Sequence, residues 1–212
     1  MKKSIARTAV GIAAIGIVAV SASACSSSKS STKPVADLPS LSGSGQTTAV
    51  ALDKGFTDAL TSLKLAPGVV GTAQLTNGSL VFPITGGHVT YYKPGSVNPF
   101  VQGDIMHQGS GISLTAGTTK VELTNFDIDP GASKLYGDVS LNGAPVASHA
   151  YLFYLDGTTL QPLQTSGNQA ILQGTKVEIS DVAAPLLDKT FNTDAVKAGL
   201  LVGVAKITVN TK

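Results

Sequence analysis

The sequence predicts an all-β fold with minor α content: an antiparallel β-sandwich or barrel with one N-terminal helix and one short C-terminal helix. Short runs rich in β-branched and aromatic residues recur along most of the chain at spacings of about ten residues, which is typical of these folds. Turn signals separate the runs, and the 212 residues include 23 Gly and 10 Pro. Strands do not alternate with long helices, which argues against a parallel sheet.

The predicted elements follow these signals in order. A helix is expected from Thr47 onwards, because the apolar residues between Val50 and Leu63 recur at mostly helical spacing and Pro67-Gly68 ends the pattern. A short helix is expected over Asp181–Thr190, capped by Ser180. Strands are expected at Val69–Leu75, Leu80–Ile84, His88–Tyr92, Gly111–Leu114, Lys120–Asp129, Lys134–Leu141, Ala147–Leu155, Gln169–Gln173, Lys176–Ile179 and Leu201–Val209.

Residues 1–24 have the pattern of a bacterial lipoprotein signal peptide. Basic residues precede the apolar run Thr8–Val20, which is too short to span a hydrocarbon core of about 30 Å as a stable helix. Small residues then lead to Cys25, the only Cys in the chain, and this segment resembles the lipobox in which that Cys is diacylated. Ala22 stands where the lipobox favours Leu, so ordinary cleavage after Ala24, giving a secreted chain, is the alternative.

The mature chain is predicted to have two parts. Residues 25–45 are expected to be a lipidated Cys followed by a flexible tether, because they are rich in Ser and Gly. Residues 46–212 are expected to form a single β-sandwich domain. The predicted location is the extracytoplasmic face of the cell membrane, with the lipid on Cys25 as the contact to the membrane.

Charge and composition exclude several kinds of partner. The formal net charge of the full chain is +2, but removal of residues 1–24 leaves 12 basic against 13 acidic residues. Arg7 is the only Arg, so the predicted mature chain has no guanidinium to read guanine or clamp phosphate, and we expect no nucleic-acid binding. With Cys25 lipidated, the chain has neither a disulfide nor a thiolate metal site.

Histidine and tyrosine are the candidate ligands for a metal or a haem. If strands alternate, His88 shares a face with Tyr92, and His149 shares one with Tyr151 and Phe153. A Tyr binds ferric iron as the phenolate, which needs a basic neighbour or the charge of the metal, and His149 beside Tyr151 is one such pair. The alternative is that these rings pack at the edge of the sheet with their polar tips in water.

Patterns for metal binding and catalysis are incomplete. Asn125, Asp127 and Asp129 alternate like the start of a calcium loop, but Pro130 stands where that loop needs Gly, so no metal site is predicted. Ser110 lies near His107 without the spacing of a nucleophile elbow. No catalytic residue is therefore assigned, and the chain is not expected to be an enzyme.

Several segments together resemble the HtaA domain, the haem-transport-associated domain of actinobacterial cell-surface proteins. A His in a Gly-rich turn precedes a strand, and two further strands, a helix and a last strand follow. These segments are His107–Leu114, Val121–Asp129, Leu135–Val139, Ala183–Phe191 and Gly199–Ala205. The resemblance implies an extracytoplasmic β-sandwich and makes haem a possible ligand.

Of the two residues that hold the ligand in that family, one has a counterpart in this chain and the other has none. In that family a Tyr on the first helix is the axial ligand of the iron, whereas Lys54–Leu60, the comparable segment, contains no Tyr. His107 carries over as the residue that orients a ligand through a hydrogen bond.

The sequence therefore favours a lipid-anchored binding or surface-interaction module whose ligand or surface protein partner is unknown. The alternative is an HtaA-like carrier of haem or another small ligand, and a hydrolase and a structural envelope protein are further alternatives. The weak candidate residues for ligand binding are His107, His149, Tyr151 and Tyr92. The residues themselves predict no cofactor. The resemblance to the HtaA domain implies haem as a candidate.

Overall fold

The computed structural model describes residues 32–211. The predicted signal peptide, the lipidation site Cys25 and the first part of the predicted tether lie outside the described residues. Residues 32–212 form one compact unit by themselves. In the part of the chain that is described, no helix is long and apolar enough to cross a membrane.

The domain is built on one antiparallel sheet, and the predicted all-β class with two short helices is confirmed. The neighbouring strands along the sheet are β1-β6-β7-β8-β9-β10-β12-β13-β2-β5-β4, while β3 pairs with β7 and β11 with β12. The strands are β1 (Ala36–Leu38), β2 (Thr47–Leu52), β3 (Ala66–Gly71), β4 (Gln74–Thr76), β5 (Ser79–Pro83), β6 (Gly86–Tyr91), β7 (Val101–Ala116), β8 (Thr119–Asp129), β9 (Lys134–Leu141), β10 (Ala144–Asp156), β11 (Gln164–Ser166), β12 (Gln169–Ile179) and β13 (Leu201–Asn210).

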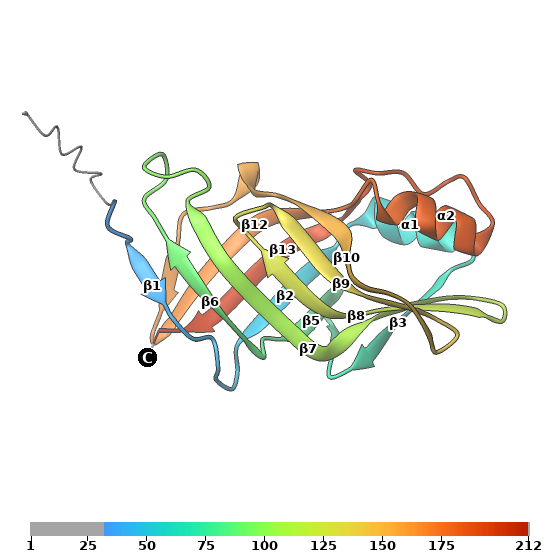
Figure 1. Cartoon of the computed structure of the whole chain (residues 1–212), viewed down its shortest axis with the longest axis horizontal. Helices are drawn as coiled ribbons and strands as arrows, with labels where there is room; N and C mark the ends of the chain where they lie inside the picture. The colour runs from blue at the N-terminus through green and yellow to red at the C-terminus, as the bar shows by residue number, and fades with distance from the viewer. Residues whose placement is uncertain (1–31, 212) are drawn as a thin grey trace, which may run out of the picture. The chain divides into compact units, whose positions relative to one another are not determined.

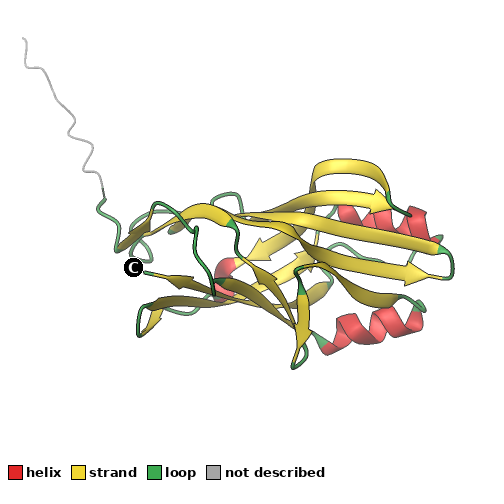
Figure 2. Cartoon of the chain, turned by 90° about the horizontal axis from the view of Figure 1, so that it is seen from below, coloured by secondary structure: helices red, strands yellow, loops and turns green. Residues whose placement is uncertain are grey.

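The sheet curls into a half-barrel rather than splitting into the two layers of a sandwich (Figures 1 and 2). β5 lies near one end of the strand order and β6 near the other, yet only Ile84 and Thr85 connect them. The Thr85 amide donates to the Met106 carbonyl of β7 at 2.8 Å, which ties this connection to the opposite part of the sheet. The inward side chains of all the long strands consequently share one apolar interior.

The N-terminal helix begins later than the sequence predicts. Residues Thr47–Leu52 form β2, which pairs with β13 and β5, and the helix α1 covers only Lys54–Ser62. The apolar residues of β2 fit the period of two as well as a helical period, and sheet pairing decides between them. Asp53 then caps α1, because its carboxylate accepts hydrogen bonds from the amides of Gly55 and Phe56.

The C-terminal helix α2 (Ala183–Phe191) lies at the same end of the half-barrel as α1 (Figure 1), and Figure 2 shows the two helices on different sides of that end. The Ser180 hydroxyl accepts a hydrogen bond from the Ala183 amide at 2.9 Å, in the capping role that the sequence predicts. Asn192 follows in the left-handed conformation and ends the helix.

The folded unit begins before Gln46, within the predicted tether. β1 pairs with the edge strand β6, and Leu41 is completely buried. The Leu41 amide also donates to the Gly87 carbonyl at 2.8 Å. Isolated apolar residues in a Ser-rich segment give a weak sequence signal, and only the open edge of β6 gives this segment a partner.

Candidate ligand-binding cavity

The half-barrel encloses a cavity of about 390 Å³ toward the end that carries the C-terminus, away from the helices. This volume lies within the range of about 300–1,000 Å³ found for small-molecule sites. Its deep wall is formed by inward-facing aliphatic side chains from seven strands. Among them are Val50, Ile105, Ile128, Leu135, Leu155, Val177 and Ala205.

Polar side chains occur mainly where loops and turns border the cavity. Asn98, Ser133 and Thr158 lie there, together with Asp156, whose charge is already compensated. The Asp156 carboxylate accepts from the Thr158 amide at 2.9 Å and lies 3.5 Å from Lys176 Nζ. The hydrogen bonds to Thr158, with a smaller contribution from Lys176, lower the pKa of Asp156 below its ordinary value. The cavity therefore offers no free charge to an ionised ligand.

A layer of aromatic side chains lies between the cavity lining and the helix end of the interior. Phe126 packs edge-on against Phe82, with ring centroids 5.3 Å apart, and against Phe153 at 6.3 Å. His107 packs edge-on against Phe82 at 6.3 Å. We call these four residues the aromatic layer.

The order of residues along the strands shows that the aromatic layer divides the interior in two. On β8, Ile128 lines the large cavity, Phe126 belongs to the layer, and Leu123 lines a second space beyond it. This second space, between the helices and the sheet, measures only about 40 Å³. Phe56 and Leu60 of α1 and Leu187 of α2 fill it with apolar side chains.

His107 is a buried, neutral member of the aromatic layer. It is 1% exposed, and its Nε2 lies 2.8 Å from Thr48 Oγ1. Burial lowers the pKa of His107 from 6.5 to about 4. Its Nδ1 has no hydrogen-bond partner among the described residues. His107 does not line the large cavity itself, but Thr48 does.

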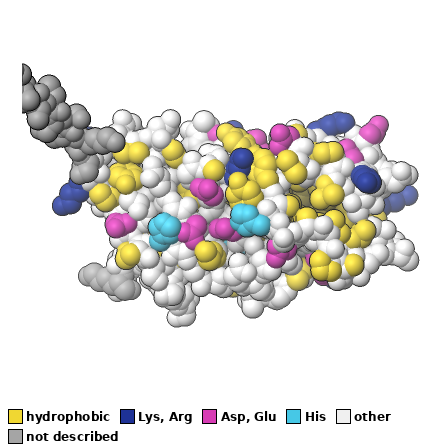
Figure 3. Space-filling view, in the orientation of Figure 1, with side chains coloured by type: hydrophobic (Ala, Val, Ile, Leu, Met, Phe, Trp, Pro, Cys, Tyr) yellow, Lys and Arg dark blue, Asp and Glu magenta, His cyan; other side chains and the backbone are white. Residues whose placement is uncertain are grey.

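His149 belongs to a polar cluster on the outer face of the sheet. Its ring stacks on Tyr136 at 4.5 Å, and its Nε2 lies 3.2 Å from Asp127 Oδ2. The His149 amide donates to Asp138, which also accepts from the Asn125 amide group at 2.8 Å. These hydrogen bonds lower the pKa of Asp138, with the bond from Asn125 contributing most. Figure 3 shows His side chains beside acidic ones on this face.

The two candidate tyrosines lie apart from the cavity lining. Tyr151 packs against Tyr136 on the outer face, with ring centroids 6.0 Å apart. Burial raises the pKa of Tyr151, which disfavours the phenolate that iron binding needs. Phe153 points inward instead of sharing the face of Tyr151, because an irregularity in the pairing of β10 with β9 separates them. Tyr92 is half-buried just beyond β6, whereas its neighbour Tyr91 lines the cavity.

The residues present do not fit haem held in the way that the resemblance implies. The first turns of α1 contain Phe56 and Thr57 but no Tyr, and the space beside this helix is about 40 Å³. His107 is committed to Thr48 inside the aromatic layer. A ligand of porphyrin size at this end of the half-barrel requires the apolar packing between the helices and the sheet to open.

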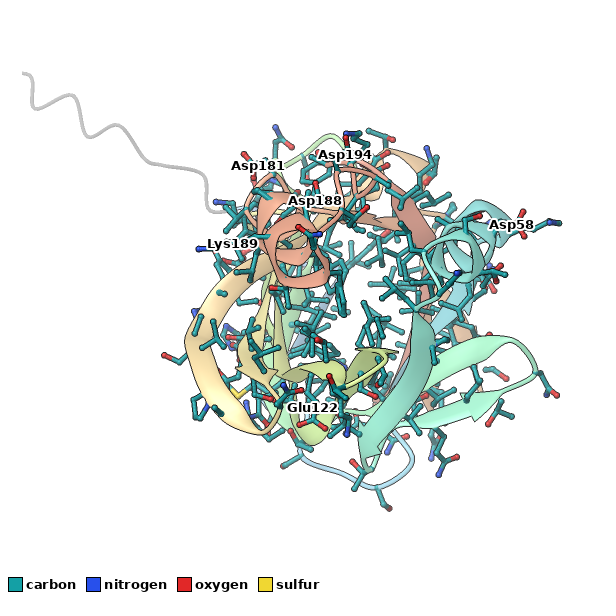
Figure 4. All side chains as sticks on the ribbon, turned by 90° about the vertical axis from the view of Figure 1, so that its right-hand side faces the viewer. Asp58, Glu122, Asp181, Asp188, Lys189 and Asp194 are labelled. Atoms are coloured by element: carbon teal, nitrogen blue, oxygen red, sulfur yellow. The ribbon has the colours of Figure 1, made fainter. Side chains whose placement is uncertain are left out.

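Charged side chains of both signs lie at the helix end of the molecule. Figure 4 looks at this end and labels Asp58 on α1, Asp181 beside α2 and Lys189 on α2 among them. Asp188 accepts a hydrogen bond from the Val196 amide at 3.0 Å, which holds the loop after α2. Across residues 32–211, no group of three or more His, Cys, Asp or Glu side chains is arranged to hold a metal ion.

The serine near His107 is a structural residue. Ser110 is completely buried, and its hydroxyl donates to the His107 carbonyl oxygen at 3.0 Å. The hydroxyl therefore supports the irregular stretch of β7 and is bonded to the backbone of His107, not to its ring.

Sequence reasoning missed the residues that line the cavity. Thr48 and Tyr91 are the clearest cases, since the helical spacing places Thr48 at the start of a helix and the strand pattern favours Tyr92 as the candidate residue. The available signal was the alternation of apolar residues on the strands. Alternation identifies an inward face, but whether that face is filled or hollow depends on the curl of the sheet.

The amino-acid sequence matches no family model and no curated protein. The fold, however, is similar to solved structures. The C-terminal domain of HtaA from Corynebacterium glutamicum superposes with a TM-score of 0.52 and 13% identity, over 82% of this chain and 98% of that domain.

Two further structures from Corynebacterium glutamicum have TM-scores of 0.48. One is the heme binding protein HtaB, with 8% identity over 82% of this chain and 96% of that one. The other is the N-terminal domain of HtaA, with 9% identity over 79% and 97%. The superposition on the C-terminal domain of HtaA shows that the described part of this chain has an HtaA-like fold.

Proposed function

We propose that this domain is a carrier that binds one small, mainly apolar molecule in the large cavity of its half-barrel. The observation that carries the proposal is the cavity of about 390 Å³ with its aliphatic deep wall. Burial of an apolar ligand there removes its surface and that of the wall from water, which contributes roughly 25 cal/mol per Å² before the cost of association.

The bound part of the ligand is uncharged in this proposal. Asp156 is the one side chain in the lining that is charged at neutral pH, and it is paired with Lys176 and Thr158. An ionised ligand group deep in the cavity has no opposite charge to meet it, and its desolvation opposes binding. A polar group at the outer end of the ligand lies beside Asn98, Ser133 and Thr158 near the mouth.

The carrier is proposed to work outside the cytoplasm, attached to the membrane through a lipid on Cys25. Ala36 and Leu38 follow Cys25 by 11 and 13 residues and line the cavity. A lipid on Cys25 therefore keeps the cavity near the membrane surface, where apolar molecules are concentrated. Replacing Cys25 by Ala in the full chain should release the domain from the membrane fraction, and continued membrane association of that variant contradicts the anchor.

The binding test uses residues 32–212 and N-phenyl-1-naphthylamine, an uncharged dye whose fluorescence rises in apolar surroundings. Saturable binding of one dye molecule is expected. Ala205→Phe places a large side chain in the cavity and should weaken binding at least tenfold. Val204→Phe is the matched control, because Val204 is the next residue on β13 and is 40% exposed on the opposite face.

Ala170→Phe repeats the test from β12 in case the Ala205 variant folds poorly. Circular dichroism confirms the fold of each variant. Equal dye binding by the folded cavity variants and by the Val204 control rejects the cavity as the site.

Haem is the second ligand to test, because the HtaA-like fold supports the carrier class. In the cavity its iron would meet only the phenols of Tyr91 and Tyr154 as neutral candidate ligands among the lining residues. A saturable Soret shift at one equivalent that weakens in Tyr91→Phe or Tyr154→Phe supports haem at this site. No shift, together with dye binding, leaves an apolar molecule other than haem.

A further inference from the structure

A buried polar pair lies at the inner end of the mainly apolar cavity. Thr48 is 3% exposed, lines the cavity from β2, and pairs across the sheet with Phe82 of the aromatic layer. Its Oγ1 lies 2.8 Å from Nε2 of His107, which belongs to the same layer. Buried polar groups are normally hydrogen-bonded, and a buried group with unused donors or acceptors beside a cavity can bond to a ligand.

The hydrogen-bonding capacity of the pair is only partly used within the described residues. His107 Nδ1 has no partner, and the Thr48 hydroxyl bonds only to His107. Gln46, which is buried just before β2, is a contrast: its Nε2 donates to the Leu41 carbonyl and its Oε1 accepts from the Asn210 amide, each at 3.0 Å. Both polar ends of the Gln46 side chain bond to backbone groups. The Thr48 hydroxyl, in contrast, bonds to no described group other than the His107 ring.

Both tautomers of neutral His107 leave the Thr48 hydroxyl with unused hydrogen-bonding capacity. If Nε2 carries the proton, it donates to Thr48 Oγ1, and the hydroxyl hydrogen is available to an acceptor in the cavity. If Nδ1 carries the proton, the Thr48 hydroxyl donates to Nε2, and its oxygen lone pairs are available to a donor. The low pKa of His107 keeps the pair uncharged at neutral pH in either case.

We propose that Thr48, held by His107, is the polar anchor of the cavity and selects an apolar ligand that carries a hydroxyl or carbonyl group on its inserted end. This inference rests on the proposed function, because it assumes that the large cavity is the binding site. His107 acts as a positioning residue, since it reaches the ligand only through Thr48. An uncharged hydrogen-bonding group satisfies the anchor, whereas a purely apolar ligand leaves its buried hydroxyl unpaired and therefore binds more weakly.

The test compares two probes of nearly equal size and shape, 2-naphthol and 2-methylnaphthalene, in displacement of the dye from residues 32–212. Thr48→Val removes the hydroxyl but keeps the shape of the side chain. In this variant, the preference for 2-naphthol over 2-methylnaphthalene, measured as the ratio of their dissociation constants, is expected to fall about five- to tenfold. A change of this size corresponds to one neutral hydrogen bond. Thr48→Ser retains the hydroxyl and should keep the wild-type ratio.

A spectroscopic measurement separates anchoring from a merely structural role. The ¹⁵N chemical shifts of the His107 ring report its tautomer, and 2-naphthol should move them while 2-methylnaphthalene should not. An unchanged ratio in Thr48→Val with unmoved His107 shifts overturns the anchor while the cavity remains. If neither probe nor the dye binds the wild-type domain, the proposed function itself is wrong.

Discussion

At the residue scale, burial decides the chemistry of His107. Its ring lies in the aromatic layer, where removal from water disfavours the charged form. The folded chain therefore takes up a proton on this ring only near pH 4, whereas the unfolded chain does so near pH 6.5. The contribution of neutral His107 to the free energy of unfolding is therefore fully present above pH 6.5. It is lost as the pH decreases from 6.5 toward 4.

This linkage gives a prediction about acid sensitivity. Lowering the pH from 7.5 to 5 should reduce the free energy of unfolding by about 2 kcal/mol through His107 alone. Urea unfolding at a series of pH values measures the slope, and His107→Gln should flatten it in this window. His149→Gln, on the outer face, is the control that should retain the slope. An identical slope in the His107 variant and the wild type contradicts the assignment.

At the element scale, the close approach of β9 to the aromatic layer depends on Gly137. A Cβ at this position meets the Thr124 carbonyl oxygen and the Phe126 Cδ1 at 2.9 Å each, and the Leu152 Cδ1 at 2.8 Å. The carbonyl belongs to the neighbouring strand β8 and cannot move without disturbing the ladder. A side chain here therefore pushes β9 away from the packed rings.

Gly137→Ala is expected to lower the free energy of unfolding by about 1–3 kcal/mol through this overpacking. Gly157→Ala is the matched control, since nothing lies within 4 Å of a Cβ there. Chemical unfolding of the three proteins measures the difference. Equal stability of the two variants contradicts this prediction, because it means that β9 can move to accommodate the added methyl group without loss of stability.

The start of α1 is a second feature at this scale. Asp53 Oδ1 accepts from the Gly55 amide at 2.7 Å and satisfies a donor that the helix leaves open. Asp53→Ala should therefore cost about 1 kcal/mol of stability. Asp58→Ala removes only the exposed ion pair with Lys54 and should change stability by less than about 0.5 kcal/mol. Similar losses in both variants contradict the capping role.

At the scale of the whole molecule, the aromatic layer sets the size of the ligand. Phe126 is the central ring, in contact with both Phe82 and Phe153. The layer separates the cavity of about 390 Å³ from the space of about 40 Å³ beside the helices. A smaller side chain at Phe126 is expected to lower stability and to connect the two spaces.

Phe126→Leu tests this partition. It should reduce the free energy of unfolding by about 1–3 kcal/mol and allow larger apolar dyes to bind than the wild type accepts. Calorimetric unfolding and a series of dyes of increasing length measure the two effects. Phe100→Leu is a control outside the layer, at the mouth of the cavity. Loss of stability without any change in the accepted dye length rejects the layer as the limit on ligand size.

Local sequence signals are enough to predict the class of fold and much of its local structure. Turn residues and alternating apolar residues placed most strands, and Ser180 marked the start of α2, because these signals act within a few residues. The segments from His107 to Val139 pointed to the HtaA-like fold, which the structural comparison confirms. The signal peptide and Cys25 remain predictions from sequence.

Tertiary structure alone decided where the interior is filled and where it is hollow. Thr47–Leu52 became a strand because β13 and β5 pair with it, and its inward Thr48 thereby met His107 from 59 residues away. The cavity has no local signature, since the same aliphatic residues line the cavity and fill the core. Its volume follows from the curl of the sheet and from the aromatic layer, which are set by contacts between residues distant in the chain.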